Sequence, residues 1–207
     1  MIAIIDYKAG NLTSVRLALE HIGAECVITS DASTISAADR IIFPGVGAAG
    51  EAVRNLEQLG LIGAIRQAAR SGKPFLGICL GTQIILDYSE EDGGTECLGV
   101  LPGEVRRFAP ADPSYKIPHI GWNTVRIVKP HPIFEGIEDE SEFYFVHSYY
   151  PVPSDKAHVF GETEYAEVSF ASVIGCSNIV AVQFHPERSG RIGLQLLANF
   201  VRWDGKC

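Results

Sequence analysis

Residues 75–83 read FLGICLGTQ, and this stretch decides the fold because two glycines join a strand signal to a helix signal. Residues 75–78 form a short apolar run typical of a buried strand, and residues 80–87 follow a helical pattern. A Gly-x-Cys-x-Gly turn between strand and helix forces its central residue into a strained conformation, with the side chain above the sheet. Cys79 is therefore either a nucleophile or a small apolar side chain buried at a tight turn.

The first half of the chain alternates strand and helix signals around this turn. Strand-like apolar runs occupy residues 1–6, 25–29, 40–47 and 75–78, and helical patterns begin at Leu12 and cover 51–58, 61–71 and 80–87. Such alternation predicts βαβ units and a parallel sheet that is buried on both faces. Ligands of these sheets bind at the carboxyl ends of the strands. We therefore expect both glycine-rich turns, which follow the third and fourth strands, at the binding edge.

The second half is dominated by strand signals. They cover residues 104–108, 122–128, 142–150, 158–163, 168–175 and 178–184. A last helix follows, with Ser189 as its expected N-cap. No linker rich in proline, glycine or serine divides the chain. The expected fold class is α/β: a single domain over residues 1–207, with a mostly parallel central sheet flanked by helices and extended by antiparallel strands in the second half.

Composition excludes several classes of function. The chain has 207 residues, 46% of them hydrophobic, and a formal net charge of −8, which argues against binding to nucleic acid or to anionic membranes. Its five cysteines are odd in number, scattered and without a C-x-x-C pair, so we expect inert core cysteines, no disulfide framework, no metal site and no cofactor. The N-terminal apolar run is too short to span a membrane, and a cytoplasmic protein is expected.

A second stretch, VAVQFHPERSG at residues 180–190, offers the groups that a nucleophilic cysteine needs. His185 ends a strand, and Glu187 lies two residues on, which is the same side of an extended backbone. Glu187 can then orient the imidazole of His185, which takes and returns the thiol proton. An isolated H-x-E is more often a polar strand end. Together with Cys79 it predicts a Cys-His-Glu triad.

A third stretch, FPGVGAAG at residues 43–50, is the other glycine-rich turn. Its glycines permit close backbone approach, so an N–H of Val46 or Gly47 could join that of Leu80 in stabilising an oxyanion. A plain glycine turn is an alternative. A phosphate-binding loop is a weaker one, because no P-loop lysine or serine follows and G-x-G-x-x-G is incomplete.

GICLGTQ together with FHPE resembles the signature of the class I, triad-type glutamine amidotransferases, and the resemblance extends over essentially the whole chain. One subgroup, the glutaminases of histidine biosynthesis, is resembled most closely, through IAIIDYKAGNLTSV, PGVGA, PHIGWN and FYFVHSYY at residues 2–15, 44–48, 118–123 and 143–150. Thr82 departs from the pattern, since many relatives have methionine there. Arg188 departs too, because lysine is common after His-Pro-Glu.

The resemblance implies a reaction and a set of roles. Cys79 would attack the carboxamide of L-glutamine and form a glutamyl thioester, His185 would move the protons, and Glu187 would orient His185. Backbone N–H groups of Gly47 and Leu80, with Val46 beside them, would bind the oxyanion. Gln83, Glu91 and the backbone around Ser148 would contact the substrate glutamine.

The resemblance also implies a partner. Ammonia would pass to a (β/α)8-barrel cyclase subunit, which joins it to a phosphorylated ribulosyl intermediate. We expect the interface to include Trp122, Asn123, Tyr144 and Arg188, because exposed aromatic and arginine side chains are enriched at binding hot spots. Core packing is the alternative for Trp122, Tyr144 and His147.

Three other functions stay open from the sequence. The chain could be a glutaminase of another pathway, such as anthranilate, pyridoxal phosphate or para-aminobenzoate synthesis. It could be a cysteine hydrolase of γ-glutamyl or peptide bonds. It could also be a binding subunit with a relic site, although a relic would be expected to have lost a member of the triad.

Overall fold

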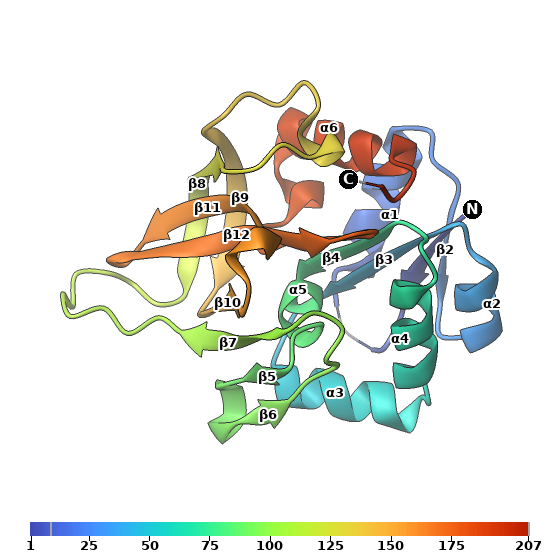
Figure 1. The fold of residues 1–207 in the computed structure, drawn as a ribbon, viewed down its shortest axis with the longest axis horizontal. Coiled ribbons are helices and arrows are strands. Elements are labelled where there is room, and N and C mark those ends of the chain that lie inside the picture. The colour runs from blue at the N-terminus through green and yellow to red at the C-terminus, as the bar shows by residue number, and fades with distance from the viewer. Residues whose placement is uncertain (9, 207) are drawn as a thin grey trace.

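The computed structural model describes residues 1–8 and 10–206, and its main layer is a nine-stranded sheet (Figure 1). The strands run in the order β2-β1-β3-β4-β13-β12-β11-β8-β9. Their bounds are β1 (Ile2–Ile5), β2 (Cys26–Thr29), β3 (Arg40–Gly45), β4 (Phe75–Cys79), β8 (His119–Ile127), β9 (Ser141–His147), β11 (Val159–Tyr165), β12 (Val168–Cys176) and β13 (Ile179–Val182). The pairs β1–β2, β1–β3, β3–β4 and β4–β13 are parallel, and the remaining pairs are antiparallel. This confirms the expected fold class.

Helices cover both faces of the parallel half of the sheet. Ile2 and Ile4 of β1 belong to the core on one face, and Ala3 and Ile5 belong to the core on the other. Helices α1 (Leu12–His21) and α6 (Gly190–Arg202) pack on the first face, and α3 (Ala49–Gln58), α4 (Ile62–Arg70) and α5 (Leu80–Ile84) on the second (Figure 1). The strands are apolar on both sides because both sides are covered.

A sixth helix, α2 (Ala32–Ala37), was not expected from the sequence. Its start follows ordinary capping, because the side chain of Asp31 accepts a hydrogen bond from the backbone N–H of Thr34 at 2.8 Å. Ile35 is its buried residue and joins the core beneath α4. With a single buried side chain, α2 has too little apolar periodicity to stand out in the sequence.

A second, four-stranded sheet was also unexpected. It runs in the order β10-β7-β5-β6, with bounds β5 (Tyr88–Ser89), β6 (Thr95–Glu96), β7 (Gly103–Arg107) and β10 (Tyr149–Pro153). The aromatic run at 142–150 therefore contains two strands, β9 and β10, in different sheets. The chain crosses from one sheet to the other at Ser148, which brings this backbone close to the end of β4.

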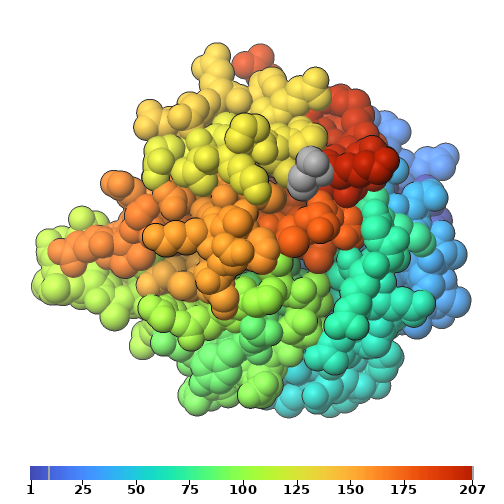
Figure 2. All heavy atoms as spheres, viewed as in Figure 1, coloured from blue at the N-terminus to red at the C-terminus, as the bar shows by residue number. Residues whose placement is uncertain are grey.

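Four short 3-10 turns complete the secondary structure of the described residues: η1 (Glu91–Gly93), η2 (Pro132–Phe134), η3 (Lys156–His158) and η4 (Pro186–Arg188). No helix of residues 1–8 and 10–206 combines the length and apolarity that crossing a membrane requires. Figure 2 shows the early residues, in blue and teal, beside the late strands, in yellow and orange, as two adjoining parts of one surface.

Several predicted boundaries were wrong. The helix expected over 80–87 ends at Ile84, and the strand expected from Trp122 already begins at His119. Ser189 precedes α6 as expected but does not cap it with its side chain. Its hydroxyl instead donates to the carbonyl of His185 at 2.7 Å and accepts from the N–H of Tyr144 at 3.0 Å.

The two glycines of the turn that ends β4 are required by close backbone packing. A Cβ on Gly81 would lie 1.8 Å from the carbonyl oxygen of Phe43 in β3. A Cβ on Gly77 would lie 2.9 Å from that of Ala181 in β13. The turn is thus packed directly against both neighbouring strands, and any side chain at these glycines would displace it.

We predict opposite effects for two helical glycines. Gly81→Ala should lower the free energy of unfolding by about 1–3 kcal/mol, because the new methyl group meets fixed backbone. Gly63→Ala in α4, where no atom lies within 4 Å of the added Cβ, should raise it by about 0.5–1 kcal/mol. Urea denaturation of both variants measures the difference. Equal stabilities would contradict the packing described for the turn.

Candidate active site

Cys79 is the last residue of β4 and the N-cap of α5, and its backbone is strained. Its φ of 53° and ψ of −109° lie outside the regions that a non-glycine residue ordinarily adopts. The strain turns the chain sharply from strand into helix and leaves Leu80 as the first helical residue. The N–H of Leu80 has no acceptor within its own helix, because it belongs to the first turn. It is available to a ligand beside the sulfur.

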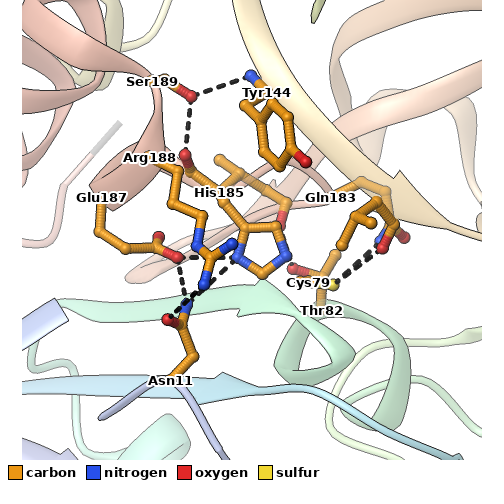
Figure 3. Close-up of polar contacts among 11 residues, drawn as sticks. Asn11, Cys79, Thr82, Tyr144, Gln183, His185, Glu187, Arg188 and Ser189 are labelled. Atoms are coloured by element: carbon orange, nitrogen blue, oxygen red, sulfur yellow. Dashed lines mark hydrogen bonds and ion pairs between the residues drawn. The ribbon is translucent and has the colours of Figure 1, made fainter. Parts of the chain in front are cut away.

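His185 and Glu187 form a buried pair. Nδ1 of His185 lies 2.8 Å from Oε1 of Glu187, and both side chains are almost fully shielded from solvent. The predicted contact is present, but the predicted reason was wrong: η4 curls the chain from Pro186, so the two side chains meet around a 3-10 turn and not along an extended strand. In Figure 3 the imidazole lies between the Glu187 carboxylate and Cys79.

The opposite nitrogen of the same ring, Nε2 of His185, is buried and has no hydrogen-bond partner. Burial by itself lowers the pKa of His185, but the electrostatic interactions of the ring with Cys79 and Glu187 outweigh it and raise that pKa to about 10. This environment favours the imidazolium form of the ring. Nε2 then has a proton to give to a group bound at the sulfur.

Strand β9 is hydrogen-bonded to the backbone of His185. The carbonyl of Tyr144 accepts a hydrogen bond from the N–H of His185 at 2.9 Å. Ser189 links the same two residues through its hydroxyl (Figure 3). The turn that carries His185 and Glu187 is therefore fixed to β9, the last strand in the order of the nine-stranded sheet, which restricts the position of the ring.

Thr82, one of the two departures from the family pattern, has a structural role. Its hydroxyl is fully buried and donates to the carbonyl of Val182 at 2.6 Å. This bond ties α5 to the end of β13, the strand that leads to His185. The hydroxyl is satisfied, so threonine is accommodated in an otherwise apolar position.

Asn11 was missed as a candidate site residue. Its amide Nδ2 donates to Oε1 of Glu187, and its Oδ1 accepts from Arg188 at 3.4 Å. An asparagine directly before a helix is ordinarily an N-cap, but Asn11 has a φ of 73° and makes no side-chain cap. Because an asparagine at this position is typical of a helix cap, the sequence does not indicate its contacts with Glu187 and Arg188.

Gln183 was also missed, although the sequence carries a signal for it. It is the one amide in the apolar run 179–184, and the structure buries it completely. Its Nε2 donates to the sulfur of Cys79 at 3.8 Å, and its Oε1 accepts from Gln83 at 3.0 Å. This contact places an amide donor beside the sulfur.

A cavity of about 220 Å³ opens beside the sulfur. Its volume is below the range of pockets for drug-sized ligands and suits a small metabolite. All six residues predicted for the oxyanion and the substrate contribute to its wall, which consists of Val46, Gly47, Cys79, Leu80, Gln83, Glu91, Pro118, Val146, His147, Ser148 and Tyr149.

Two side chains in this wall already make hydrogen bonds within the protein. Gln83 uses both amide hydrogens, on Gln183 and on the carbonyl of Tyr149 at 2.9 Å, so its Oε1 is what it can offer a ligand. Glu91 accepts from the N–H of Ala49 at 2.7 Å and thereby caps α3. Burial raises the pKa of Glu91.

The expected interface residues differ in exposure. Trp122 is 53% exposed, with its ring 6.1 Å from that of Tyr144, and Ile120 on the same side of β8 is 60% exposed. Arg188 is exposed and Asn123 is half-buried. Core packing is thus wrong for Trp122 and right for His147, which is buried. Tyr144 and His147 lie on opposite faces of β9, since Phe143, Phe145 and His147 all point inward.

The other cysteines of the described chain, Cys26, Cys97 and Cys176, are free thiols that are half-buried and pack against the two cores, so they lie at the margin of the core and not inside it. Within residues 1–8 and 10–206, no group of three histidine, cysteine or acidic side chains is arranged to hold a metal ion.

Comparison with known proteins agrees with this geometry. The family model described as "Glutamine amidotransferase class-I" matches residues 3–203. The imidazole glycerol phosphate synthase subunit HisH of Nitratidesulfovibrio vulgaris strain Hildenborough is 51% identical, over 98% of this chain and 96% of the relative. The subunit of the same name from Nitrosococcus oceani is 49% identical, over 99% and 98%.

Solved structures share the fold at lower identity. PurLQS from Thermotoga maritima has a TM-score of 0.75 at 20% identity, over 97% of this chain and 96% of that one. The glutaminase domain of Trypanosoma brucei CTPS, with bound acivicin, has a TM-score of 0.65 at 19% identity, over 100% and 97%. The family match over nearly the whole chain and the relatives at half identity lead to one conclusion: this chain belongs to the class I glutamine amidotransferases.

Proposed function

We propose that this chain is the glutaminase subunit of an imidazole glycerol phosphate synthase, and that Cys79, His185 and Glu187 are its catalytic triad. The observation that carries the triad is the unpartnered Nε2 of His185, which faces a cysteine on a strained strand-to-helix turn while Nδ1 is held by Glu187. The subunit assignment is supported by the printed names of relatives that are about half identical over nearly all of both chains.

In the first half-reaction the Cys79 thiolate attacks the side-chain carbonyl carbon of L-glutamine. A C–S bond forms, and the oxyanion accepts hydrogen bonds from the N–H of Leu80 and from the loop at Val46 and Gly47. The C–N bond then breaks, and Nε2 of His185 gives its proton to the leaving nitrogen, which departs as ammonia. A glutamyl thioester remains on the sulfur.

In the second half-reaction His185, now neutral, takes a proton from water. The resulting hydroxide attacks the thioester carbon, the C–S bond breaks, and glutamate leaves. The imidazolium and the thiolate are restored together. Glu187 stabilises the imidazolium in both steps without taking the proton itself, because its carboxylate stays hydrogen-bonded to Nδ1 and to Asn11.

The proposal includes delivery of ammonia to a (β/α)8-barrel cyclase subunit and a cytoplasmic location, where a biosynthetic partner would be found. Exposed Trp122 and Ile120 on β8, together with Arg188, offer apolar and cationic side chains of the kind that form interface hot spots. Arg188 contacts Asn11, which contacts Glu187, so the proposed interface adjoins the triad.

The other functions have less support. A peptide hydrolase would need a longer groove than a cavity of about 220 Å³. A relic binding subunit would be expected to lack a triad member, yet all three side chains are present and close together. The relatives at about half identity described above carry the name of the imidazole glycerol phosphate synthase subunit, which favours that enzyme over a glutaminase of another pathway.

Cys79→Ala should abolish product formation from glutamine, because the variant has no atom to form the thioester. Synthesis driven by ammonium salts in the complex with the cyclase should survive, because it bypasses this step. Cys26→Ala, a half-buried cysteine at the opposite end of the sheet, is the control and should retain both activities. Glutamine use by Cys79→Ala would end the proposal.

Glu187→Gln should flatten the dependence of stability on pH. The folded pKa of His185 is raised to about 10, above its unfolded value of about 6.5. Its contribution is thus complete below about pH 6.5 and is lost as the pH rises toward 10. Without the carboxylate the pKa falls, so the free energy of unfolding should decline less between about pH 6.5 and 9. Denaturant titrations measure this, with exposed Glu57→Gln as control; parallel curves for all three proteins would refute it.

Trp122→Ala should weaken binding of the cyclase by roughly 30-fold, the loss of about 2 kcal/mol expected for a buried aromatic hot spot. Its thermal stability should be unchanged, since the ring is exposed in the free chain. Tyr88→Ala removes another exposed aromatic, on β5 of the four-stranded sheet, and should bind normally. Isothermal titration with the purified cyclase gives both affinities, and equal values would exclude Trp122 from the interface.

A further inference from the structure

A pair of buried histidines lies beside the cavity but takes no part in the proposed chemistry. His119 of β8 and His147 of β9 are partners in the antiparallel register, and Nδ1 of His119 lies 3.0 Å from Nε2 of His147. Both rings are buried, and His147 lines the cavity. A direct contact between two imidazoles requires that one nitrogen donates and the other accepts.

The neighbouring contacts fix the direction of this bond. Nδ1 of His147 lies 2.7 Å from the carbonyl oxygen of Tyr149, which can only accept, so Nδ1 of His147 carries the proton. Its Nε2 is then the acceptor, and the proton between the rings belongs to Nδ1 of His119. That leaves Nε2 of His119 to accept from the amide of Asn123 at 3.4 Å.

The amide orientation of Asn123 is fixed independently. Its Oδ1 accepts from the N–H of Thr124 at 2.8 Å, and its Nδ2 donates to the carbonyl of Glu164 at 3.0 Å. The chain of hydrogen bonds therefore runs one way, from Asn123 through His119 and His147 to the carbonyl of Tyr149. Each imidazole in it is neutral and carries its proton on Nδ1.

Aromatic rings enclose the pair and exclude water from it. His119 is stacked between Phe145 at 5.0 Å and Tyr165 at 3.8 Å. His147 contacts Phe108 at 5.3 Å and Phe170 at 5.2 Å. Burial in these surroundings lowers the pKa of His119 to about 4 and that of His147 to about 3, which agrees with two neutral rings.

The chain ends on the backbone that forms one wall of the cavity. The carbonyl of Tyr149 accepts a second hydrogen bond, from Nε2 of Gln83 at 2.9 Å, and the carbonyl of Ser148 accepts from the N–H of Phe108 at 3.0 Å. These bonds hold the two residues where the chain crosses between the sheets. Ser148 belongs to neither strand, whereas Tyr149 begins β10 and pairs with Arg107, so the side-chain bonds to the Tyr149 carbonyl act at the point where the chain passes from one sheet to the other.

We propose that His147, and His119 through it, are positioning residues that hold the backbone of Ser148 and Tyr149 in the geometry that binds glutamine. They act through a single tautomeric state with both protons on Nδ1. The proposal rests on the proposed function, since it takes glutamine as the ligand of this cavity. It assigns no proton transfer to either ring.

Steady-state kinetics in the complex with the cyclase tests the positioning role. His147→Phe keeps the packing but removes the donor to Tyr149, so KM for glutamine should rise about three- to tenfold with little change in kcat, which is the loss of one hydrogen bond. His147→Asn, whose amide can replace Nδ1, should restore KM. His131→Phe is the matched control: His131 is equally buried and stacked on Phe160 at 5.0 Å, but lies outside the cavity wall.

Nitrogen NMR of the wild-type chain tests the tautomers without depending on any variant or on activity. The expected spectrum has protonated Nδ1 and unprotonated Nε2 for both His119 and His147. A proton on Nε2 of either ring would overturn the proposal. So would an unchanged KM in His147→Phe, or an equal rise in His131→Phe. If the wild type itself releases no glutamate from glutamine, the proposed function fails instead, while the tautomers are still read directly.

Discussion

The parallel pairing of β13 with β4 is the constraint on which the site depends. Ile78 stands opposite Val182 in this register, so the two strands end together at the same edge of the sheet. Cys79 follows one of them and the His185 turn follows the other. The hydroxyl of Thr82 donates to the carbonyl of Val182, 100 positions along the chain, and so links the ends of the two strands. A slip of one residue in the register would exchange the faces of β13 and separate the sulfur from the ring.

Around the ends of β4 and β13 most buried polar groups have a hydrogen-bond partner, and the exceptions are informative. Thr82, Gln183 and Ser189 are all bonded, and their bonds connect α5, β13, β9 and η4. Nε2 of His185 is the unpartnered atom that faces the sulfur. Native proteins leave few buried donors unsatisfied, and those few concentrate at functional sites. Oε2 of Glu187 is likewise buried without a partner, so the bonded frame leaves atoms of the proposed triad itself unsatisfied.

Local sequence signals predicted the parallel half of the fold well, because periodicity and glycine-rich turns act over short distances. Residues 75–83 alone indicate a strand, a strained turn and a helix. The four-stranded sheet was not predicted, since β5 and β6 have two residues each and exist only through pairing with distant strands. The break at Ser148 was missed for the same reason: both flanking segments are aromatic and strand-like, and only tertiary pairing assigns them to different sheets.

The site was predicted less evenly. Cys79, His185 and Glu187 were brought together by chemical reasoning, although the contact of the last two depends on a 3-10 turn that the sequence did not suggest. Asn11 and Ser189 both occupy positions typical of helix caps, but their side chains bond to Glu187 and to the carbonyl of His185 instead. Local rules fail at such residues because a tertiary contact outweighs the capping bond that the same side chain could make.

The most direct test of the account is mass spectrometry of the complex with the cyclase, acid-quenched during turnover of glutamine and digested. We expect a glutamyl group on the peptide that contains Cys79. The amount of this adduct should fall when turnover is stopped before quenching. A glutamyl group on Cys26, Cys97 or Cys176, or turnover with no cysteine adduct at any quench time, would contradict it.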